Sequence, residues 1–292
     1  AAFKLCRYLM CLTGDARYCA WAEKLLYNGV LSLPPVTKDG KIMYYANYFL
    51  DGGIKSNLDR RYHGAPEAYD DLNVTYHYSW QCCTGTYPQA VAEYVNMIYF
   101  IRGGDLYVSQ YMPSMLKEEV GGTQMTLTCK TRYPEEETVY YCISCESPVE
   151  RTIYFRIPAW VKESPAVYVN GVKQTVEGRP GEWMPVSKTW RDQDTIMVKI
   201  GMPLYFEKID NKNKDIVSLL YGPVVLVSDD LAAFCEDPDH VEEWIERVPG
   251  ERLKFRTKPG AMEGIYDFET RDFVPYWSYP EGKWYFLYFW LH

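Results

Sequence analysis

The apolar positions in the first hundred residues recur at helical spacing. The run Leu5–Leu12 places its apolar side chains on one stripe, and Thr13-Gly14-Asp15 then supplies a glycine stop followed by an aspartate N-cap. The next apolar stripe predicts a second helix that ends near Asn28-Gly29. A third helix is expected from Pro88, a favoured first-turn residue, to a stop at Gly103-Gly104.

A long connection separates the second and third predicted helices. Residues 31–80 hold several glycine and proline turn signals and one extended piece at 42–47. Connections of this length usually carry function. Each predicted helix has one apolar stripe and no facing layer to bury it against, so we interpret residues 1–103 as the end of a larger α-domain.

After Gly104 the hydrophobic period changes to two, which is the spacing of half-buried strands. The expected strands are 106–111, 124–129, 138–143, 216–227 and 284–290, and Val169-Asn170-Gly171-Val172 is a two-residue hairpin signal. Short strands at this spacing indicate β-sandwiches, which we assign to 104–205 and 206–292. We interpret 229–262 as a long loop or insertion in the second sandwich. The predicted class is an α+β multidomain protein.

Composition and charge exclude several classes of protein. With 47% hydrophobic and 24% charged residues, the chain is neither disordered nor collagen-like. The 31 basic and 39 acidic residues give a net charge of −8, so we expect no nucleic-acid partner. No apolar run approaches the roughly 20 residues that cross a bilayer, so we expect no membrane span. Aromatic residues, at 16%, suit strands and also sugar-stacking surfaces.

The sharpest chemical feature is the adjacent cysteine pair in Trp80-Gln81-Cys82-Cys83-Thr84-Gly85-Thr86, just before the third predicted helix. Both thiolates can reach one soft metal ion, and a helix N-terminus favours ionised sulfur. Two buried thiols are an equal alternative on spacing alone. Zinc usually takes four ligands, and His63 and His77 are local candidates, although a loop histidine is more often a polar surface residue.

The other candidates for chemistry favour structural roles. Cys142 and Cys145 lie three residues apart in a strand pattern and should point to opposite faces. We interpret the remaining cysteines, at 6, 11, 19, 129 and 235, as packing residues, and the odd total of nine favours free thiols or metal ligands over a disulfide framework. The carboxylates of Glu67, Asp70, Asp71 and Glu93 are expected to be solvated. No serine-hydrolase, phosphate-loop or dinucleotide motif occurs.

These motifs together resemble glycoside hydrolase family 127, the β-L-arabinofuranosidase-like proteins. The segments that carry the resemblance are, in chain order, Thr13-Gly14-Asp15-Ala16-Arg17-Tyr18, Leu26-Tyr27-Asn28, Cys82-Cys83-Thr84-Gly85-Thr86, Ile98-Tyr99-Phe100, Leu106-Tyr107-Val108, Met112-Pro113-Ser114, Arg156-Ile157-Pro158-Ala159-Trp160, Val169-Asn170-Gly171, Thr189-Trp190-Arg191-Asp192-Gln193-Asp194 and Leu220-Tyr221-Gly222-Pro223-Val224-Val225-Leu226. The resemblance implies an (α/α)6 barrel followed by β-sandwiches, of which this chain would hold the end of the barrel and the sandwiches.

The resemblance also implies a retaining, exo-acting glycosidase that uses a zinc-bound cysteine on arabinose-containing plant-type glycans. By motif position Cys82 would be the nucleophile and a zinc ligand, Cys83 a second zinc ligand, and Tyr45 a side chain that lines the sugar site. The remaining zinc ligands and the acid/base glutamate of the family would lie before Ala1, so we expect this stretch alone to be inactive. Gln89 stands where many relatives carry an acidic residue.

Two other functions stay open at this stage. In one, the chain is a non-catalytic carbohydrate-binding or structural β-sandwich module in which Cys82 and Cys83 are buried. In the other, the free thiols serve a small-molecule or redox role, although no cofactor motif accompanies them. A homodimer and either the bacterial cytoplasm or the periplasm are compatible with the sequence.

Overall fold

The computed structural model describes residues 2–32, 50, 52–54, 88–234, 237–262, 270–280 and 283–291. The chain divides into two compact units, one of residues 1–26 and 92–203 and the other of residues 27–91 and 204–292. The extended piece expected at 42–47 lies outside the described residues. The domain boundaries expected at 103 and 205 stay predictions.

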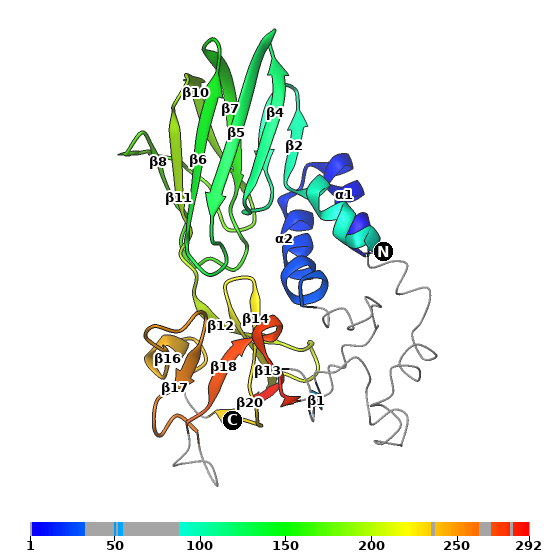
Figure 1. Ribbon diagram of the computed structural model, residues 1–292. Helices are drawn as coiled ribbons and strands as arrows, with labels where there is room; N and C mark the ends of the chain where they lie inside the picture. Colours follow the sequence, from blue (N-terminus) through cyan, green and yellow to red (C-terminus); the bar gives the residue numbers. More distant parts are fainter. Residues whose placement is uncertain are drawn as a thin grey trace. The chain divides into compact units, whose positions relative to one another are not determined.

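The first two predicted helices form a hairpin. Helix α1 spans Ala2–Thr13 and α2 spans Ala16–Leu25, followed by a π-helical turn at Leu26–Val30 (Figure 1). Asp15 caps α2, because its side chain accepts a hydrogen bond from the Arg17 backbone N–H at 2.9 Å. Both the glycine stop and the aspartate cap are therefore confirmed. No helix among the described residues is long and apolar enough to cross a membrane.

The third predicted helix is wrong in length. Residues 88–93 are helical and continue as a 3-10 turn at Tyr94–Met97, but strand β2 follows at Tyr99–Arg102. This strand pairs antiparallel with β3, Asp105–Val108. Gly103 and Gly104, with φ of +61° and +91°, form the hairpin turn between them and do not end a helix.

The strands of the first unit form two sheets that pack as a sandwich (Figure 1). The four-stranded sheet has the order β10-β7-β3-β2, and the six-stranded sheet has the order β4-β5-β6-β11-β8-β9. Tyr141 of one sheet contacts Phe155 of the other at 5.4 Å between ring centroids. The further bounds are Ser114–Val120 (β4), Thr123–Thr131 (β5), Thr138–Cys145 (β6), Val149–Arg156 (β7), Ala166–Val169 (β8), Val172–Lys173 (β9), Trp183–Trp190 (β10) and Thr195–Lys199 (β11).

The expected hairpin at residues 169–172 is confirmed. Val169 pairs with Val172, and the two turn residues, Asn170 and Gly171, have φ of +51° and +79°. Positive φ at both central positions is the requirement of a type I′ turn, which explains the Asn-Gly pair.

Strands are also the main regular structure in the described part of the second unit. The 216–227 segment, expected as one strand, forms two, because Gly222 at φ +53° turns the chain between β13 and β14. Residues 229–262 carry short strands as well as loop. The bounds are Gly53–Ile54 (β1), Leu204–Lys208 (β12), Ile216–Tyr221 (β13), Val224–Val227 (β14), Ala233–Phe234 (β15), Ile245–Arg247 (β16), Phe255–Thr257 (β17), Asp272–Pro275 (β18), Trp284–Tyr285 (β19) and Phe289–Leu291 (β20).

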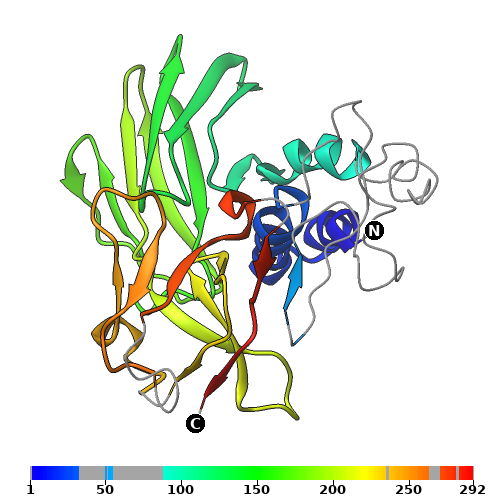
Figure 2. The same ribbon diagram turned by 60° about the horizontal axis from the view of Figure 1, so that its bottom comes forward.

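Distant parts of the sequence meet in this second unit. Figure 2 shows the blue strand β1 beside the red C-terminal segment, where Gly53 pairs with Tyr285 of β19. Aromatic side chains fill its core: the Phe234 ring lies 5.9 Å from Phe289, and Phe273 lies 5.3 Å from Phe289. The mostly-β architecture with sandwich-like packing therefore agrees with the predicted strands, while the (α/α)6 barrel stays a prediction.

Candidate functional site

The residues that the sequence nominates for catalysis lie outside the described part of the chain. These are Tyr45, Cys82 and Cys83, together with the histidine candidates His63 and His77. Within the described residues, no group of three or more His, Cys, Asp or Glu side chains could hold a metal ion. The nucleophile, the zinc ligands and the sugar-lining tyrosine therefore stay predictions.

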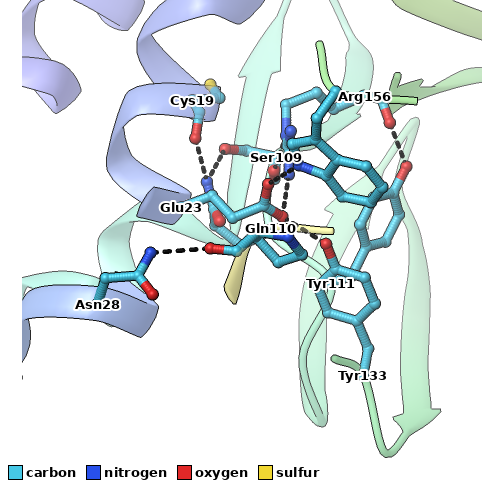
Figure 3. Close-up of polar contacts among 10 residues, drawn as sticks. Cys19, Glu23, Asn28, Ser109, Gln110, Tyr111, Tyr133 and Arg156 are labelled. Carbon is cyan, nitrogen blue, oxygen red and sulfur yellow. Dashed lines mark hydrogen bonds and ion pairs between the residues drawn. The ribbon is translucent and has the colours of Figure 1, made fainter. Parts of the chain in front are cut away.

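The described part contains instead a buried polar cluster centred on Glu23 (Figure 3). Glu23 of α2 is 1% exposed, and it forms an ion pair with Arg156, which is fully buried at the end of β7. The Tyr133 hydroxyl donates to Oε1 of Glu23 at 2.8 Å. The Trp160 indole N–H donates to Oε2 at 3.2 Å. Both carboxylate oxygens are thus occupied by donors from the sandwich.

Arg156 is held on its other side by backbone groups (Figure 3). Its Nε donates to the Ser109 carbonyl at 2.7 Å, and the Tyr111 hydroxyl donates to the carbonyl of Arg156 itself. Beside it, Gln110 donates from Nε2 to the Cys19 carbonyl of α2 at 2.8 Å. Side chains and backbone together therefore join α2 to the sandwich.

The electrostatics of the cluster keep the Arg156 guanidinium charged. Burial alone would lower the pKa of Arg156, but the adjacent Glu23 carboxylate outweighs it and raises that pKa above its ordinary value. Burial raises the pKa of the Tyr111 hydroxyl, which keeps it neutral. With both oxygens of Glu23 engaged and 1% of the residue exposed, this carboxylate cannot reach a substrate. The cluster is an anchor and not a catalytic acid or base.

The sequence motifs include one half of this cluster and not the other. Arg156 and Trp160 belong to one of those motifs, but their partner Glu23 lies 133 residues before Arg156. The signal that could have found Glu23 is its place in the apolar stripe of α2, between the buried Cys19 and Leu26. A carboxylate on a buried helical face requires a partner, and a strand-end arginine in an apolar strand requires one too.

Two further contacts hold the helical hairpin to the rest of its unit. Glu93, expected to be solvated, instead forms an ion pair with Arg7 of α1, and its side chain is 16% exposed. The Trp183 indole N–H of β10 donates to the carbonyl of Gly14 in the hairpin turn at 2.9 Å. The hairpin is therefore attached at its turn and along both helices.

The described thiols mostly pack as expected. Cys6, Cys19 and Cys129 are buried, and burial raises the pKa of each to about 11. Cys11 is exposed, so its interpretation as a packing residue is wrong. In β6, Cys145 follows the inward-facing Ile143 in the alternation, whereas Cys142 lies on the opposite face, as predicted for residues three apart.

Comparison with known proteins supports one family. Residues 105–202 match the family model described as the β-L-arabinofuranosidase GH127 middle domain. No curated protein matches the chain.

Solved structures share the fold over the whole chain. A GH127 β-L-arabinofuranosidase from Geobacillus stearothermophilus T6, Ara127N-Se, matches all of this chain and 49% of its own at 21% identity, with a TM-score of 0.72. A protein described as a glycoside hydrolase matches 99% of this chain and 51% of its own at 18% identity, also with a TM-score of 0.72. The GH127 β-arabinofuranosidase BT3674 matches all of this chain and 48% of its own at 16% identity, with a TM-score of 0.70.

The chain therefore spans about half the length of these solved structures and has the fold of the corresponding half. Its middle part, the sandwich that carries Arg156 and Trp160, also matches the family in sequence. The resemblance to glycoside hydrolase family 127 is confirmed in sequence over residues 105–202 and in fold over the chain.

Proposed function

We propose that this chain is part of a retaining, exo-acting glycoside hydrolase that removes β-L-arabinofuranosyl or related sugars from plant-type glycans. The observation that carries the proposal is the match of residues 105–202 to the GH127 middle domain. The shared fold with two solved β-arabinofuranosidases adds support, although a fold alone can host many reactions.

In this proposal the Cys82 sulfur is the nucleophile. It attacks the anomeric carbon of the terminal sugar, the bond from that carbon to the leaving oxygen breaks, and the leaving oxygen takes a proton from a general acid. Water then attacks the same carbon and gives a proton to the deprotonated general acid, which restores the thiolate and releases the sugar with its configuration retained. The general acid is expected outside this chain, as the family resemblance implies.

Cys82 and Cys83 would hold a zinc ion. Thiolate sulfurs are ligands that zinc prefers, and adjacent thiols supply two donors at one point of the chain. When bound, the metal keeps the sulfur ionised at neutral pH. Tyr45 would line the sugar site.

We further propose that α1 and α2 belong to an (α/α)6 barrel. Helix α1 buries Phe3, Cys6 and Met10 on one side. On another side Leu5, Tyr8 and Leu12 are 47%, 50% and 80% exposed, which is an apolar stripe that a further helix would cover. The additional half of the solved relatives supplies enough chain for such helices.

The decisive experiment measures metal and activity in the full-length protein that contains this chain. Elemental mass spectrometry should find about one zinc per chain, and hydrolysis of a β-L-arabinofuranoside should be detectable. Cys82→Ser should lower turnover by several orders of magnitude, and the double variant Cys82→Ser with Cys83→Ser should lose the metal. Cys11→Ser is the matched control, since Cys11 is an exposed thiol of the described part. A zinc-free wild type with full activity, or an active Cys82→Ser variant, would refute the proposal.

A further inference from the structure

The outer face of the six-stranded sheet carries a row of side chains that neither the anchor nor the proposed catalysis uses. Cross-strand pairing sets these side chains in one line across five strands, β5, β6, β11, β8 and β9 (Figure 1). We call this line the tyrosine row: Lys130, Tyr140, Met197, Tyr168 and Lys173.

The two tyrosines of the row face outward. Tyr140 is 52% exposed, whereas its neighbour Tyr141 points into the sandwich at 2% exposure, as strand alternation requires. Tyr168 is partly exposed and lies between the buried Val167 and Val169. Among the residues that the structure describes, neither the Tyr140 nor the Tyr168 hydroxyl has a hydrogen-bond partner. Both rings and both hydroxyls are therefore available to a ligand.

The spacing of the rings suits a polymer. One strand, β11, separates Tyr140 from Tyr168, and adjacent strands lie about 4.8 Å apart, so the two side chains leave the sheet about 9.6 Å apart. That separation is close to the distance between alternate sugar rings in an extended β-1,4-linked polysaccharide. Met197 lies between them and provides an apolar floor for the intervening sugar.

The charge on this face is opposite to that of the whole chain. Lys130 is directly opposite Tyr140, Lys173 is directly opposite Tyr168, and Lys199 follows Met197 on the same face of β11; all three lysines are exposed. Within this fully described sheet none of the three pairs with an acidic side chain, and the one outward acidic position on its strands is Glu119 at the far edge. A chain with net charge −8 thus presents a positive strip around two aromatic rings.

We infer that the tyrosine row binds an extended acidic polysaccharide, one whose sugars carry uronic-acid carboxylates. Tyr140 and Tyr168 stack against alternate sugar rings, and Lys130, Lys173 and Lys199 pair with the carboxylates beside them. This surface holds the polymer without cleaving it. The inference does not rest on the proposed glycosidase activity, because it uses no residue of the proposed catalytic site.

The test is the affinity of this chain for β-1,4-linked polyglucuronate, measured by isothermal titration calorimetry at low and at physiological salt. Binding should weaken as salt rises, and it should be lost on the fully methyl-esterified polymer and on a neutral β-1,4-glucan. Tyr140→Ala with Tyr168→Ala should weaken binding about tenfold or more, and Lys130→Gln with Lys173→Gln should do the same.

Matched control variants show whether the loss of affinity is specific to the tyrosine row or follows from removing any exposed tyrosine or lysine. Tyr8→Ala removes a tyrosine of similar exposure, 50%, and Lys212→Gln removes an exposed lysine of the second unit; both should keep wild-type affinity. Cys82→Ser should also bind as wild type, which distinguishes the row from the proposed catalytic site. The tyrosine and lysine variants should keep the wild-type melting temperature, since their side chains are on the surface. Unchanged affinity in the double-tyrosine variant, equal binding of the neutral glucan, or equal binding of oligo(dT) would overturn the inference.

Discussion

Replacing Glu23 by alanine is the sharpest test of the anchor. The substitution leaves the fully buried Arg156 guanidinium without its counter-charge and also removes the acceptor for the Tyr133 hydroxyl and the Trp160 indole. Breaking a buried ion pair by deleting one partner costs about 3–5 kcal/mol, because a charge stays buried and uncompensated. Native domains are stable by only about 5–15 kcal/mol, so this single change should remove a large fraction of the stability of the first unit.

The assay is urea unfolding followed by the fluorescence of the chain's nine tryptophans, of which Trp160 lies at the cluster. With a slope of about 2 kcal/mol per molar urea, a loss of about 4 kcal/mol lowers the midpoint by about 2 M. Glu23→Gln should lose a similar amount, since a neutral amide does not compensate the guanidinium. The exposed pair Arg132–Glu136 is the control: its side chains are 63% and 46% exposed, and Glu136→Ala should cost less than about 1 kcal/mol.

The double variant Glu23→Leu with Arg156→Met tests whether the instability of the single variants comes from an uncompensated buried charge or from lost packing. Removing both charges avoids the uncompensated ion, so the double variant should be more stable than either single variant. The anchor does not work as a buried charge pair if Glu23→Ala shifts the urea midpoint no more than Glu136→Ala does. The same conclusion follows if the double variant loses as much free energy of unfolding as Glu23→Leu and Arg156→Met lose together.

Three further outcomes follow from the described residues. Burial alone would raise the pKa of Asp194, but its hydrogen bonds, first that from the Asn170 side chain, outweigh burial and lower that pKa. The contribution of Asp194 to stability is therefore complete above about pH 4 and is lost as the pH falls further. Asp194→Asn should flatten the acid limb of a curve of unfolding free energy against pH. In the native protein, iodoacetamide should label the exposed Cys11 within minutes and Cys19 far more slowly, because Cys19 is fully buried with a pKa of about 11. Peptide mass spectrometry measures the two labelling rates, and equal rates would contradict the packing of α2. Gly14→Ala should lower the melting temperature by several degrees, because φ of +73° strains any side chain at that turn; an unchanged melting curve would argue against this turn geometry.

Local signals made much of the fold predictable. The glycine stop and Asp15 cap fix the α1–α2 turn within a few residues, and the Asn170-Gly171 pair fixes a hairpin through its own backbone preference. The expected strand at 124–129 lies within β5, because inward and outward side chains alternate there without interruption. In each case the cause and the structure lie within the same short stretch of chain.

Long-range pairing explains what the sequence did not reveal. The apolar run Ile98 to Ile101 fits a helix as well as a strand, and it becomes strand β2 because β3 is there to pair with it. The partner of Glu23, Arg156, could not be identified from α2 alone. For Tyr45, Cys82 and Cys83 the prediction rests on motif resemblance, and none of them lies among the described residues.

The anchor also bears on the role of the sandwich formed by residues 105–202. The part that matches the family, residues 105–202, contains Arg156, Trp160 and Tyr133, but their common acceptor, Glu23, lies outside it on α2. A sandwich that served only as an independent module would gain nothing from a buried arginine whose counter-charge belongs to another element, since the isolated charge costs several kcal/mol. These residues therefore fit a sandwich that folds together with the helical hairpin and fixes its position, while the opposite sheet leaves the tyrosine row exposed.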